Sequence, residues 1–110
     1  MSKRSFEAHL DWLKGEVMSC NLINVSILRK NIDVHLTNAL AMIEPSETVM
    51  LQRRSLTARL QEFAEIASDM LCRKELLEAK KNEAAHEIEA FRAECHKCPP
   101  SPMAVALGVD

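Results

Sequence analysis

Residues that break secondary structure are scarce in this chain, which has two glycines and four prolines among 110 residues. Before Cys98, only Gly15 and Pro45 belong to these two types. Sandwiches and barrels need many tight turns, and those turns depend on glycine and proline. Phosphate-binding loops and nucleophile turns also need glycine at fixed spacing. We therefore predict an all-α protein made of long helices, and we do not expect an enzyme.

Aromatic residues and excess charge are also scarce. The chain contains one tryptophan, three phenylalanines and no tyrosine, and its 14 basic and 16 acidic residues give a net charge of -2. Binding to nucleic acid or to an anionic membrane normally needs a positive excess. The longest uncharged run before the C-terminal segment covers residues 17–28, which is short of the roughly 20 residues of a transmembrane helix. We expect a soluble, cytoplasmic protein without a cofactor or a small-molecule substrate.

Proline positions predict how the chain is divided. Pro45 disfavours helical geometry at the preceding residue, so a turn is expected at residues 44–46. Ser46 is a suitable helix N-cap, and Pro99 and Pro100 cannot continue a helix. These signals predict one helix over about residues 5–43 and a second over about 47–97. Residues 1–98 would form an antiparallel helical hairpin, and residues 99–110 a flexible proline-containing tail.

The second predicted helix has a regular apolar seam. Apolar residues recur at alternating spacings of three and four, which is the period of a left-handed coiled coil. Arg53, Lys74 and Lys81 interrupt this seam, where they could set the register or simply remain exposed. The seam is best defined by seven residues: Leu56, Leu60, Phe63, Met70, Leu77, Ile88 and Phe91.

Two opposite sides of the first predicted helix are apolar. One side includes Leu28, Ile32 and Leu36, whereas Ile23, Ile27 and Val34 fall roughly opposite, in the direction of Trp12. A hairpin partner covers only one side of a helix, so the second side predicts another protein or a second copy of the chain. A bend within residues 19–26, where asparagine and β-branched residues weaken the helix, is the competing explanation. We take Trp12, Ile23, Ile27 and Val34 as the partner-binding residues.

Two other groups of residues suggest alternative functions. Cys95 and Cys98 have the spacing of zinc and redox motifs, but only one such pair exists and a structural zinc needs four ligands. Arg53, Arg54 and Arg59 could form a basic patch for nucleic acid, although no aromatic residues are interleaved with them. As evidence of function, neither the cysteine pair nor the arginine group is stronger than the amphipathic helices. The sequence therefore predicts a non-enzymatic interaction module of the adaptor, chaperone or inhibitor type, which forms a homodimer or binds another protein. The alternatives are a transcriptional regulator and a thiol or metal sensor.

Overall fold

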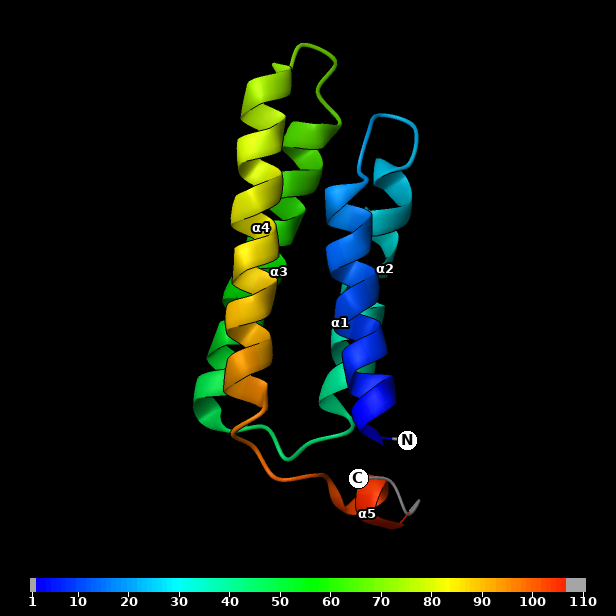
Figure 1. Ribbon diagram of the computed structural model, residues 1–110, viewed down its shortest axis with the longest axis vertical. Coiled ribbons are helices and arrows are strands. Elements are labelled where there is room, and N and C mark those ends of the chain that lie inside the picture. The colour runs from blue at the N-terminus through cyan, green and yellow to red at the C-terminus, as the bar shows by residue number, and fades with distance from the viewer. Residues whose placement is uncertain (1, 107–110) are drawn as a thin grey trace.

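Four helices run alternately up and down in the computed structural model, which describes residues 2–106 (Figure 1). They are α1 (Ser2–Met18), α2 (Val25–Leu40), α3 (Glu47–Ala67) and α4 (Lys74–Cys95), and a fifth short helix, α5 (Pro102–Ala106), follows them. Helices α1 and α4 lie in front and α2 and α3 behind (Figure 1). The bundle measures 49 × 24 × 17 Å. Among the described residues, none of the helices combines the length and apolar character needed to cross a membrane.

The helix expected over residues 5–43 is interrupted between Met18 and Val25. The side-chain oxygen of Asn21 accepts hydrogen bonds from the backbone N–H groups of Ile23 and Asn24, at 2.8 and 3.0 Å. Asparagine side chains that bind nearby backbone in this way compete with helical hydrogen bonding. The prediction of one continuous helix is wrong, and the break falls within the segment where the competing explanation placed a bend.

The helix expected over residues 47–97 is also interrupted, between Ala67 and Lys74. No glycine or proline lies in this stretch. Instead, the carboxylate of Asp69 accepts a hydrogen bond of 2.9 Å from the N–H of Leu71. The prediction of a continuous seam is therefore wrong as well, and the predicted seam residue Met70 is 83% exposed.

At the α2–α3 turn, the chain reverses at Pro45 and Ser46 caps α3. The hydroxyl of Ser46 accepts a hydrogen bond of 3.1 Å from the N–H of Val49. The C-terminal segment also reaches this turn, because the N–H of Glu44 donates to the carbonyl of Pro99 at 2.8 Å. The predicted flexible tail thus pairs with the α2–α3 turn around residues 99–101, and its last residues, 107–110, lie outside the described part.

Both interruptions let the bundle bury two apolar stripes that one hairpin could not cover. Because α1 and α2 fold against each other, their stripes meet α3 and α4 in a single core. Lys81 is the charged residue of this interior, with 8% exposure and an ion pair of 3.5 Å to Glu78. The stripes of α1 and α2 consist of Phe6, Leu10, Leu13, Val17, Val25, Leu28, Ile32, Leu36 and Ala39.

Candidate functional site

Three of the four predicted partner-binding residues lie exposed along the outer side of α2. Ile23, which precedes the helix, is 90% exposed, and Ile27 and Val34 are 49% and 50% exposed. Leu28 and Ile32 point into the core, and with about 100° between successive helical residues this turns Ile27 and Val34 outward. We call Ile23, Ile27 and Val34 the outer ridge.

Trp12, the fourth predicted residue, lies elsewhere. It is half-buried and packs against the core from α1. Its indole stacks on the imidazole of His35 on α2, with a centroid distance of 4.1 Å and an interplanar angle of 18°. Trp12 therefore joins α1 to α2 and is not part of the outer ridge.

His35 also contacts a second histidine. The Nδ1 atoms of His9 and His35 are 2.8 Å apart, so one imidazole donates its proton and the other accepts it. Burial lowers the pKa of His35, and the neighbouring His9 lowers it further. Both effects favour the neutral imidazole. The contact between α1 and α2 thus contains a histidine pair that is disfavoured when both rings are charged.

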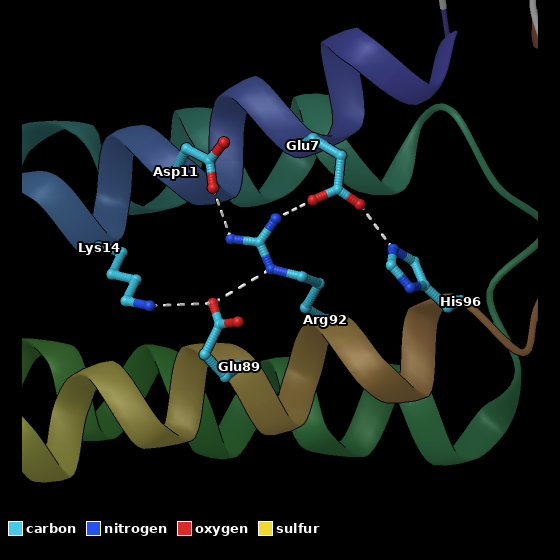
Figure 2. A network of polar contacts seen from close by, with 6 residues as sticks. All are labelled: Glu7, Asp11, Lys14, Glu89, Arg92 and His96. Carbon is cyan, nitrogen blue, oxygen red and sulfur yellow. Dashed lines mark hydrogen bonds and ion pairs between the residues drawn. The ribbon is translucent and has the colours of Figure 1, made fainter.

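A network of charged side chains connects α1 to α4 (Figure 2). Arg92 on α4 is at its centre, with a side chain that is 13% exposed. Its guanidinium donates to Glu7, to Asp11 at 2.7 Å and to Glu89 at 3.1 Å. Burial lowers the pKa of Arg92, but three carboxylates surround the guanidinium and satisfy its charge.

Two more residues extend this network at its ends. Nε2 of His96 lies 2.6 Å from Glu7, and Nζ of Lys14 lies 3.7 Å from Glu89. These two contacts could not be predicted from the sequence, because the partners are separated by more than seventy residues and appear there as ordinary surface charges. Because its charges are paired across the two helices, this network holds α1 against α4.

On the opposite side of the bundle, a groove runs between α2 and α3. It has a volume of about 410 Å³ and is lined by Asp33, Met50, Arg53, Arg54, Thr57 and Ala58. We call it the α2–α3 groove. Arg53 donates a hydrogen bond of 2.7 Å to the hydroxyl of Thr37 and lies 3.8 Å from the carboxylate of Asp33. Within residues 2–106, neither Arg54 nor Lys30 makes an ion pair or a side-chain hydrogen bond.

The fold separates the three arginines that could form a basic patch. Arg53 and Arg54 line the α2–α3 groove. Arg59 instead faces α4, where its Nε lies 3.7 Å from Glu87. The three side chains therefore do not form one surface.

The seam residues lie at very different depths. Met70 lies in the α3–α4 loop and Leu77 is half-buried. The other five are in the core: Leu56, Leu60, Phe63, Ile88 and Phe91.

The two C-terminal cysteines are free thiols in different surroundings. Cys95 is buried and Cys98 is half-buried. Burial, together with smaller contributions from the neighbouring Cys98 and Glu94, raises the pKa of Cys95 to about 12. A thiol that is protonated at neutral pH is a poor metal ligand and nucleophile. Among the described residues, no cluster of three or more histidine, cysteine, aspartate or glutamate side chains is placed to hold a metal ion.

Comparisons of the chain with protein-family models, with curated proteins and with solved structures find no match. A functional argument for this chain therefore depends on its own surfaces, of which the outer ridge and the α2–α3 groove have side chains without internal partners.

Proposed function

We propose that this protein is a non-enzymatic interaction module that buries the outer ridge of α2 against another protein, with a second copy of the chain as the first candidate. The observation that carries the proposal is the exposure of Ile27 and Val34 on the outer side of α2 and of Ile23 in the turn before it. Single exposed aliphatic residues are common, but a row of them on one face is typical of an interaction surface.

The ridge is suited to packing against a helix. Ile27 and Val34 are seven residues apart, so they lie two turns apart on the same side of α2. Ile23 is exposed in the turn that comes just before the helix. An apolar row of this kind can pack into the groove of a partner helix.

Regulation through nucleic acid and sensing through thiols receive less support. Arg59 is directed away from Arg53 and Arg54 and faces a carboxylate. Cys95 is buried and holds its proton tightly. We therefore assign no second function.

Light scattering combined with a hydrophobic dye tests the proposal. We expect the full chain to have about twice its mass of 12.4 kDa at tens of micromolar, or, as a monomer, to bind the dye through the ridge. The double variant Ile23→Asp/Ile27→Asp should be monomeric and should not bind the dye.

The matched control is Met70→Asp/Leu71→Asp, which introduces the same two charges into the exposed α3–α4 loop. This control should behave as the unmodified chain does. A monomeric wild-type protein that binds no dye would overturn the proposal, as would a dimer that the ridge variant leaves intact while the loop variant dissociates it.

A further inference from the structure

Two histidines from different helices meet where α1 packs against α2. His9 on α1 and His35 on α2 are 26 residues apart in the sequence, and their Nδ1 atoms lie 2.8 Å apart. Both side chains are half-buried, so water reaches them. They belong neither to the apolar core nor to the outer ridge. The interaction proposed above therefore gives this histidine pair no role.

The spacing of the two rings suits a shared metal ion. Their centroids are 5.0 Å apart. Two imidazoles that bind one ion through nitrogen at about 2.0–2.1 Å, with an angle of about 100–110° at the ion, have centroids roughly 5 Å apart. The two nitrogens of such a pair are about 3.1–3.4 Å apart. Small rotations of the two side chains therefore make room for an ion while the helices keep their positions.

The protonation of the pair also suits metal binding. A metal ion binds a neutral imidazole through the nitrogen that has no proton. Burial lowers the pKa of His35 and so favours its neutral form. In the hydrogen-bonded pair, one of the two Nδ1 atoms has a proton. When that ring places its proton on Nε2 instead, both Nδ1 atoms present lone pairs to the same point.

We propose that His9 and His35 bind a divalent transition-metal ion of the nickel, copper or zinc type, which links α1 to α2. Imidazole is a suitable ligand for these ions, and Cu²⁺ binds a given set of ligands most tightly among them. Water completes the coordination, because the pair supplies two ligands and no cluster of three or more histidine, cysteine, aspartate or glutamate ligands occurs among the described residues. This inference is independent of the outer ridge.

Titration of the full chain with Ni²⁺ tests the proposal, with Trp12 as the reporter. Trp12 is the single tryptophan, and its indole stacks on His35 at a centroid distance of 4.1 Å. Ni²⁺ is the probe because, unlike Cu²⁺, it does not oxidise the free thiols of the chain. An open-shell ion bound to the neighbouring ring quenches indole emission. We therefore expect saturable quenching by NiCl₂, which EDTA reverses.

Two variants remove one ligand each. His9→Gln leaves Trp12 stacked on His35 and should weaken the binding of Ni²⁺ at least about tenfold, because one nitrogen ligand remains. Ni²⁺ should raise the melting temperature of the wild type, since the ion binds the folded chain, and should not raise it in His9→Gln or His35→Gln. The matched control is His86→Gln at an exposed position of α4, which should change the affinity by less than about twofold.

Three results would overturn the proposal. The first is the lack of saturable quenching of Trp12 up to about 1 mM Ni²⁺. The second is a response to Ni²⁺ that both His9→Gln and His35→Gln leave unchanged, and the third is an equal loss of affinity in His86→Gln and His9→Gln. Circular dichroism without metal shows whether each variant keeps its helix content. If one ligand variant loses its fold, the other one decides, because the two substitutions lie on different helices.

Discussion

The α1–α4 and α2–α3 contacts lie on opposite sides of one bundle and use charge in opposite ways. At the α1–α4 contact, Arg92 is enclosed by three carboxylates (Figure 2). At the α2–α3 contact, Arg54 faces solvent beside a groove of about 410 Å³. The first arrangement uses its charges to hold two helices together, whereas the second pairs Arg53 with Asp33 and leaves Arg54 without an ionic partner among residues 2–106. In this protein, pairing therefore separates structural charges from candidate binding charges.

The largest expected effect comes from the core that both contacts share. Leu60 is fully buried on α3, so Leu60→Ala should lower the free energy of unfolding by about 2–5 kcal/mol. Met70→Ala, at a position of the same predicted seam that is exposed, should have little effect. Urea unfolding measures both. A Leu60→Ala protein as stable as wild type would mean that this core is not where the bundle gains its stability.

An intermediate effect tests the comparison itself. Arg92→Ala removes a largely buried guanidinium from three carboxylates, and we expect it to cost about 2 kcal/mol. Arg53→Ala removes a longer ion pair and one hydrogen bond from the α2–α3 contact, and we expect a cost below about 1 kcal/mol. The same urea experiment compares them. Equal losses of unfolding free energy in the two variants would contradict the expected difference between the α1–α4 contact and the α2–α3 contact.

The smallest effect concerns pH and the contact between α1 and α2. The pKa of His35 in the folded chain is lowered below its ordinary value of 6.5. The stabilisation from neutral His35 is therefore present above about pH 6.5 and is lost as the pH falls through the lower, folded-state pKa. We expect the melting temperature to drop on acidification, and to drop less in His35→Phe, which keeps a ring against Trp12 but does not titrate.

Trp12 gives an independent readout of this prediction, because it is the single tryptophan and stacks on His35. Its fluorescence should titrate with a midpoint below pH 6.5 in the wild type and should lose this transition in His35→Phe. An identical pH dependence of melting in both proteins would show that the histidine pair does not influence stability.

Sequence patterns predicted the helical class because glycine and proline are scarce and apolar residues recur at helical spacing. The turn at Pro45 and the N-cap at Ser46 could be predicted from these two residues alone, because proline fixes its own backbone angle φ and the serine hydroxyl can cap a helix. The two interruptions were harder to predict. Asn21 and Asp69 end helices by binding their own neighbouring backbone, and such residues also occur within helices at a modest cost. Bonding of these side chains to the neighbouring backbone is favoured over a continued helix only when the helices fold back on each other.

The exposed side of α2 could be recognised from its spacing, since Ile27 and Val34 lie opposite Leu28 and Ile32 in any helical arrangement. The position of Trp12 could not, because it depends on how α1 turns against α2. The α2–α3 groove and the Arg92 network could not be predicted from the sequence either. Each joins residues of two helices whose pairing follows from the interruptions, and no single stretch of sequence contains that information.

The four thiols are placed so that their labelling rates can measure local unfolding at each end of the bundle. Cys20 is buried just after α1, at the end where both helix interruptions lie, and Cys95 is buried at the last residue of α4, at the opposite end. Cys72 and Cys98 are half-buried, one near each end. In a labelling experiment with an alkylating reagent, the two partly exposed thiols supply a fast phase. The slow labelling of Cys20 and of Cys95 then measures, separately, how often each end of the bundle comes apart.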